Sequence, residues 1–87
     1  MNQHQITIAA SYRPEALERI LRVVRHRGFE IKAMQMVQTS GPEQINIEMT
    51  VASNRGIELL STQLTKLMDV DSVNVTHNET QQIRAQS

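Results

Sequence analysis

Residues 44–52 alternate strictly between polar and apolar side chains, and this pattern constrains the fold more than any other feature of the chain. The apolar positions are Ile45, Ile47, Met49 and Val51. Side chains on a β-strand alternate between two faces, so a strand with one apolar face must cover that face with a second layer. The segment therefore predicts a half-buried strand whose other face is polar.

Three further segments have the pattern of strands. They are residues 5–10, with Ile6, Ile8 and Ala10 on one face, residues 30–38, and a short strand around Val73 and Val75. In the second of these, we expect Met34 and Met36 to face the core. Residues 40–43, Ser-Gly-Pro-Glu, are typical of a turn and predict a hairpin with the strand that follows.

Two segments have the period of amphipathic helices. The first has Pro14 in its first turn and carries apolar residues at helical spacing, namely Leu17, Ile20, Leu21 and Val24. We expect it to end at Gly28 in the left-handed conformation, with Phe29 touching Val24. In the second helix, Ser53 or Asn54 is the expected N-cap. Its stripe consists of Ile57, Leu60, Leu64 and Leu67, with Met68 beside it.

The order of these elements predicts an α+β fold. Because only one face of each strand is apolar, both helices must cover the same face of the sheet. The simplest arrangement is a ferredoxin-like βαββαβ two-layer sandwich, with a four-stranded antiparallel sheet and two helices on one face. We assign residues 1–78 to this domain and expect the polar residues 79–87 to form a disordered tail.

The charge balance and the cysteine content indicate which partners the chain can bind and in which cell compartment it works. Lys plus Arg and Asp plus Glu each number 9, so the balance gives no general attraction to nucleic acid or to anionic membranes. There is no cysteine, which suits a reducing compartment. No apolar run is long enough to span a membrane, and the first residues lack a signal-peptide pattern. These features indicate a cytoplasmic protein.

The residues give little support for catalysis or metal binding. His4, His26 and His77 have no partners at ligand spacing, and we expect all of them at the surface. Asp69 and Asp71 flank Val70 and are typical of a solvated turn. We therefore predict no catalytic residues and no metal site.

Two other functions occur on chains of this layout. An acylphosphatase needs a glycine-containing phosphate loop before its first helix; here Arg13 is present but the loop has no glycine, and Glu15 would repel phosphate. RNA binding on the sheet uses aromatic residues in the central strands, whereas Tyr12 and Phe29 fall outside them. Both functions are disfavoured.

Arginines recur along the first predicted helix at positions 19, 22, 25 and 27. Glu15–Arg19 and Glu18–Arg22 stand at i, i+4 and can form ion pairs, which favours an ordinary solvated face. The alternative is a surface for docking another protein, with Arg19, Arg22 and Arg25 as its candidate residues.

Several segments resemble one known family. Residues 14–21, Pro-Glu-Ala-Leu-Glu-Arg-Ile-Leu, and residues 27–31, Arg-Gly-Phe-Glu-Ile, are similar to the core of an ACT domain. The wider run 18–29, the strand 45–53 and the segment 81–85 closely resemble small regulatory subunits of acetohydroxyacid synthase (acetolactate synthase) of the isozyme II type. The resemblance covers nearly the whole chain.

The resemblance implies a function that the residues alone do not give. Such subunits bind and activate a large catalytic subunit that carries thiamine diphosphate, Mg²⁺ and FAD. The holoenzyme condenses pyruvate with pyruvate or 2-oxobutyrate, an early step toward valine and isoleucine among the branched-chain amino acids. By resemblance, this chain is a regulatory subunit of a transferase and has no cofactor of its own. The alternative is a free-standing ACT module that senses amino acids and regulates another enzyme or a transcription factor.

The family also implies a homodimer and an effector site. Its ACT domains pair along the second strand, which predicts an interface at Lys32, Ala33, Met34, Gln35, Met36 and Val37. Valine-responsive relatives bind the effector with asparagine, glycine and asparagine at positions that fall here on Tyr12, Glu15 and Glu30. All three residues depart from this pattern, so valine binding is doubtful. The alternative interpretation is that they are ordinary loop and strand-end residues with no effector role.

Overall fold

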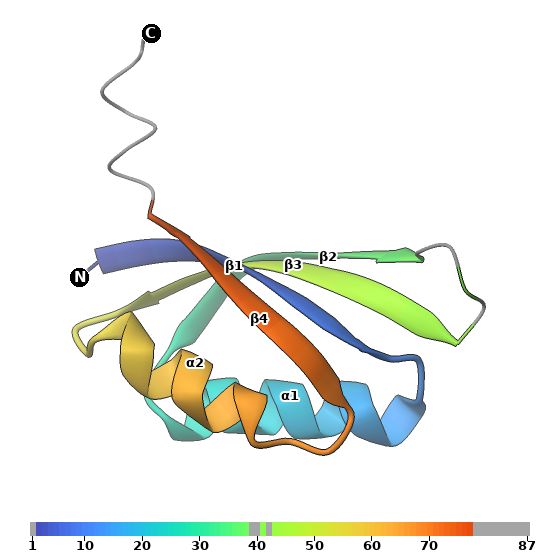
Figure 1. Cartoon of the computed structure of the whole chain (residues 1–87). Coiled ribbons are helices and arrows are strands. Elements are labelled where there is room, and N and C mark those ends of the chain that lie inside the picture. The colour runs from blue at the N-terminus through green and yellow to red at the C-terminus, as the bar shows by residue number, and fades with distance from the viewer. Residues whose placement is uncertain (1, 39–40, 42, 78–87) are drawn as a thin grey trace, which may run out of the picture.

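The structure, a computed structural model, describes residues 2–38, 41 and 43–77 of the chain. Four strands and two helices follow one another as β1 (Asn2–Ser11), α1 (Pro14–His26), β2 (Glu30–Gln38), β3 (Gln44–Ser53), α2 (Ile57–Thr65) and β4 (Val70–His77). All strand pairs are antiparallel, in the order β2-β3-β1-β4. Both helices lie on one face of the sheet (Figure 1). The predicted two-layer βαββαβ fold is confirmed, while the proposed tail at residues 79–87 lies outside the described residues.

The core forms between the helices and the covered face of the sheet. Ile8 of β1 is opposite Ile47 of β3, and both side chains are completely buried. From the helices, Ile20, Leu60 and Leu64 are equally buried. Strand alternation and helical period therefore meet in one apolar layer, as the sequence pattern predicts.

The start of β1 differs from the prediction and changes the environment of His4. The strand begins at Asn2, so His4 is in phase with Ile6 and Ile8 and faces the helices. Its exposed fraction is 8%, and the expectation that it lies at the surface is wrong. His26 is exposed as expected.

The end of α1 is closed by a Schellman motif. The N–H of Phe29 donates to the carbonyl oxygen of Val24 at 3.1 Å, and the N–H of Gly28 donates to that of Arg25 at 3.1 Å. Gly28 has φ of +85°, and Phe29 is buried in the core. The predicted helix stop at Gly28 is confirmed by these hydrogen bonds and by the positive φ.

The predicted cap of α2 is wrong. The N-cap is Gly56, which makes no side-chain cap hydrogen bond. Ser53 is instead buried: its hydroxyl donates to the carbonyl oxygen of Gly28 at 2.8 Å and accepts from the N–H of Arg55 at 3.0 Å. A serine hydroxyl near a turn can form hydrogen bonds either with the backbone at a helix end or with the backbone of a neighbouring loop. Here the Ser53 hydroxyl bonds to loop backbone, so it does not cap α2.

We expect Gly28→Ala to lower the free energy of unfolding by about 1–2 kcal/mol, because an L-residue resists the left-handed conformation. An added Cβ would also meet Nε of Arg55 at 3.0 Å, although that flexible side chain can yield. Gly41→Ala is the matched control, since its Cβ would meet nothing within 4 Å among the described residues. Urea unfolding of both variants tests this, and equal stability would contradict the Schellman assignment.

Candidate functional site

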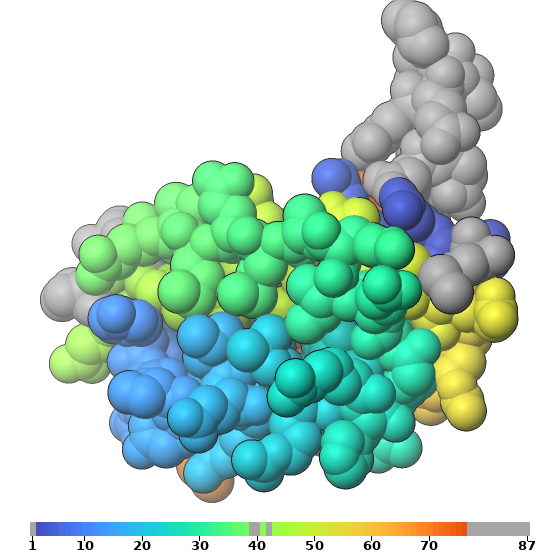
Figure 2. All heavy atoms as spheres, turned by 180° about the vertical axis from the view of Figure 1, so that it is seen from behind, coloured from blue at the N-terminus to red at the C-terminus, as the bar shows by residue number. Residues whose placement is uncertain are grey.

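Strand β2 forms one edge of the sheet and is nearly all exposed. Only Ile31 is half-buried along its length. Met34, Met36 and Val37 expose 42%, 45% and 39% of their surface. Figure 2 shows this strand beside helix α1 on the back of the molecule. An apolar edge strand without a neighbour is a ready site for pairing with another chain.

The two methionines of β2 lie on the helix side of the sheet. Met34 is opposite Met49 and Met36 is opposite Ile47, and both β3 residues are buried. The predicted orientation is therefore right, but the methionines are not buried, because β2 is the outermost strand and α1 covers it incompletely.

Helix α1 extends the apolar surface of the β2 edge. Arg19 and Arg27 bind Asp69 and Gln63, so that side of the helix faces α2 and the turn beyond it. Leu17 and Leu21 lie on the side turned away from those contacts and are half-buried against the core. The edge strand and this side of α1 thus form one surface, which we name the β2–α1 edge.

The uncovered face of the sheet has a different chemistry. A shallow groove of about 410 Å³ crosses it, with polar lining from Gln5, Thr7, Gln35, Glu48, Thr50 and Thr76. Hydroxyl and amide groups predominate, and Glu48 is the charged residue of this lining. The groove lacks the positive charge of a phosphate site and the stacked aromatic rings of an RNA-binding sheet.

The predicted effector positions are not together in one chain. Tyr12 is 58% exposed, and its N–H donates to the carbonyl oxygen of Glu43 at 2.8 Å. Glu15 is exposed in the first turn of α1, whereas Glu30 begins β2 after the helix has ended. The helix has 13 residues, which separates its ends by about 20 Å. A site that uses all three positions needs two chains.

The arginines of α1 are in different environments. Nη1 of Arg19 binds Oδ2 of Asp69 at 2.9 Å, and the Asp69 side chain is only 11% exposed. Arg22 and Arg25 are exposed and have no ion pair among the described residues. The proposed pairs with Glu15 and Glu18 do not form. Arg19 therefore ties α1 to the turn before β4 while its side chain stays 53% exposed, and Arg22 and Arg25 are the two exposed arginines of α1 without an ion pair in the part of the chain that the structure describes.

The aspartate before β4 and the aspartate within it are in different environments. Asp69 is buried against Arg19, so the expected solvated turn is wrong for this residue, while Asp71 is exposed and accepts from Nε2 of Gln44 at 3.2 Å. Within residues 2–38, 41 and 43–77, no group of His, Asp or Glu has the arrangement of a metal site. None of the helices in that part is long and apolar enough to cross a membrane.

Comparison with known proteins identifies the family. Residues 12–73 match the ACT domain family. The acetolactate synthase isozyme 2 small subunit of Escherichia coli K12 is 53% identical over 87 residues, which cover 98% of this chain and 100% of that protein. The chain belongs to the ACT domain family, among the acetolactate synthase small subunits. The Shigella flexneri small subunit of isozyme 2 is similar to the same extent.

Solved structures agree with this fold. The acetolactate synthase small subunit of Thermotoga maritima superposes with a TM-score of 0.75 at 20% identity, over 86% of this chain and 47% of that one. The ACT domain from GTP pyrophosphokinase of Chlorobium tepidum gives 0.73 at 13% identity, over 86% and 97%. The predicted ACT fold and the resemblance to small subunits are both confirmed. The 53% identity to an isozyme 2 small subunit makes this chain a small regulatory subunit and not the catalytic chain of the synthase.

Proposed function

We propose that this chain binds and activates the catalytic subunit of an acetolactate synthase. The observation that carries the proposal is the 53% identity over the full length of an isozyme 2 small subunit. The β2–α1 edge and the unpaired arginines of α1 support it, because they offer surfaces for other protein chains. The catalytic chemistry belongs to the partner, which would carry thiamine diphosphate, Mg²⁺ and FAD and act in the cytoplasm on the pathway to the branched-chain amino acids.

Activation must come from unequal binding to two states of the partner. A subunit that bound the active and inactive conformations equally would shift nothing, however tight the complex. Arg22 and Arg25 are the α1 residues that we propose for docking, since their charges are not neutralised within the described part of the chain. Arg19 is already paired with Asp69, but its side chain is 53% exposed and stays within reach of a partner.

We also propose that the chain is a homodimer through the β2–α1 edge. If β2 pairs antiparallel with β2 of a second copy, a two-fold axis passes through the middle of the strand. Glu30 of one chain then approaches the Gln38 end of the other. Gln38 is opposite Ile45, which is opposite Ala10, so that end of the sheet carries Tyr12 and Glu15. This pairing would unite the effector positions that one chain keeps apart.

We expect the chain alone to form no acetolactate and to raise the turnover of the matching catalytic subunit when added to it. The measurement is acetolactate formation from pyruvate, with the catalytic subunit fixed and the small chain titrated. A free-standing sensor module would instead leave turnover unchanged. Affinity capture from the host cytoplasm separates the two functions further, since recovery of another enzyme or a transcription factor in place of the synthase would contradict the proposal.

A further inference from the structure

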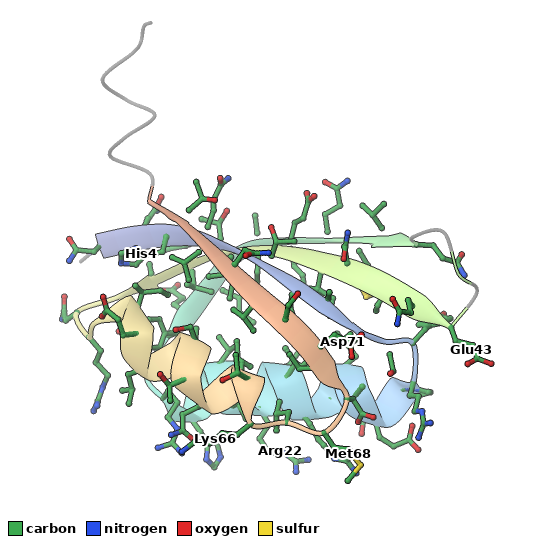
Figure 3. All side chains as sticks on the ribbon, viewed as in Figure 1. His4, Arg22, Glu43, Lys66, Met68 and Asp71 are labelled. Atoms are coloured by element: carbon green, nitrogen blue, oxygen red, sulfur yellow. The ribbon has the colours of Figure 1, made fainter. Side chains whose placement is uncertain are left out.

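Met68 is the most exposed large apolar side chain in the described part of the molecule. It exposes 92% of its surface, whereas the other exposed large apolar residues range from 36% to 58%. It lies just beyond α2, in the turn formed by residues 66–69, which we name the Met68 turn. Figure 3 shows Met68 projecting from the helix layer, away from the sheet.

The Met68 turn is fixed on both sides of the methionine. Before it, the N–H of Leu67 donates to the carbonyl oxygen of Leu64 at 3.1 Å; after it, the N–H of Val70 donates to that of Leu67 at 3.1 Å. The carbonyl oxygen of Asp69 accepts from the N–H of Ser11 at 2.9 Å, and the Asp69 carboxylate binds Arg19. The backbone that carries Met68 is thus already ordered, and a partner need not order it on binding.

Two exposed basic side chains lie on the same side of the helix layer as Met68 (Figure 3). Lys66 lies two residues before Met68. Arg22 lies one turn of α1 after Arg19, which forms the ion pair with Asp69. Lys66 and Arg22 are exposed and have no ion pair among residues 2–38, 41 and 43–77. Glu18 precedes Arg22 by one helical turn without pairing with it. The three labelled side chains Arg22, Lys66 and Met68 all extend from the same side of the helix layer in Figure 3.

We propose that the Met68 turn is the apolar anchor by which this chain docks on the catalytic subunit. The matching site has an apolar pocket for the methionine and carboxylates on its rim for Arg22 and Lys66. This inference rests on the proposed function and names its surface. Methionine suits such a pocket because its unbranched side chain adapts to irregular shapes. The cations supply orientation and speed of association, while the buried side chain supplies most of the affinity.

The ion pair between Arg19 and Asp69 supports the proposed docking by holding the Met68 turn in place. It acts as a positioning contact, because it ties the Met68 turn to α1 through the nearly buried carboxylate of Asp69. The docking surface also lies apart from the β2–α1 edge, since Arg19 and the β2-facing leucines are on different sides of α1. A homodimer can therefore present two Met68 turns at once.

The test compares Met68→Glu with Leu59→Ala in titrations of the catalytic subunit. Leu59 is 36% exposed in the first turn of α2, outside the Met68 turn, and serves as the matched apolar control. We expect Met68→Glu to raise the concentration needed for half-maximal stimulation at least about tenfold. Leu59→Ala should titrate as the wild type. Arg22→Glu should weaken stimulation more at low than at high salt, because exposed charges are screened.

The outcomes distinguish this inference from the proposed function. If the wild-type chain fails to stimulate, the proposed function fails. If the wild type stimulates and Met68→Glu has an unchanged titration, the anchor is wrong and the function stands. An equal loss in Leu59→Ala would also overturn the anchor. Thermal unfolding verifies that Met68→Glu folds normally, as its 92% exposure requires.

Discussion

Glutamate in place of Met36 should weaken the dimer at least about 100-fold, which corresponds to roughly 3 kcal/mol. The two-fold axis of an isologous dimer repeats each substitution, so two carboxylates would enter one apolar contact. The free chain tolerates the change because Met36 is already 45% exposed in it. The dimer should therefore dissociate without loss of the monomer fold. Sedimentation equilibrium from micromolar to millimolar concentration measures the constant.

The control for this experiment is Asn74→Glu on strand β4. It places the same charge on the opposite edge of the sheet, where Asn74 is also exposed. We expect its dimer to have the wild-type affinity. A wild-type chain that stays monomeric throughout would refute the homodimer. A dimer of unchanged affinity in Met36→Glu, with Asn74→Glu weakened, would move the interface from β2 to β4.

Local patterns predicted most of the fold. The alternation of residues 44–52 fixes which face of β3 is buried, and Gly28 ends α1 because only a left-handed residue closes that helix in a Schellman motif. Period and turn chemistry act over a few residues, so they can be read directly from the sequence. The same patterns assign Met34 and Met36 to a face of the sheet, and the βαββαβ order places β2 at its edge. Neither predicts how much of the two methionine side chains α1 leaves exposed.

Contacts between residues far apart in the sequence could not be predicted from local patterns. Arg19 and Asp69 are separated by 50 positions, and helical spacing favoured Glu15 as the partner of Arg19 instead. The exposed apolar side chain of Met68 depends on where the turn after α2 points, and its place beside a core stripe suggested burial. His4 is buried because β1 begins earlier than its apolar alternation. Each case is decided by packing, which has no signature in a short window of sequence.

Valine should neither bind this chain tightly nor inhibit its holoenzyme. We expect a dissociation constant weaker than about 1 mM, equivalent to roughly 4 kcal/mol of binding free energy. Glu15 places a carboxylate in the first turn of α1, where the effector carboxylate of valine-responsive relatives would approach the helix N-terminus. Glu30 can accept but not donate hydrogen bonds, and it lies 3.3 Å from Nζ of Lys32. Calorimetric titration of the dimer with valine, leucine and isoleucine measures the affinities.

The reverse experiment restores the residues of the responsive pattern. A chain with Tyr12→Asn, Glu15→Gly and Glu30→Asn should bind valine at least about tenfold more tightly than the wild type, since it regains donors and loses two repelling charges. Met36→Glu in the same background should abolish the gain, because in the proposed dimer the pairing of β2 with β2 would bring position 30 to positions 12 and 15. Sub-millimolar valine binding by the wild-type chain, removed by Glu15→Gln or Glu30→Gln, would show instead that these carboxylates bind the effector through its ammonium group. A gain that survives in the monomeric background would place the effector site within one chain and separate it from the dimer.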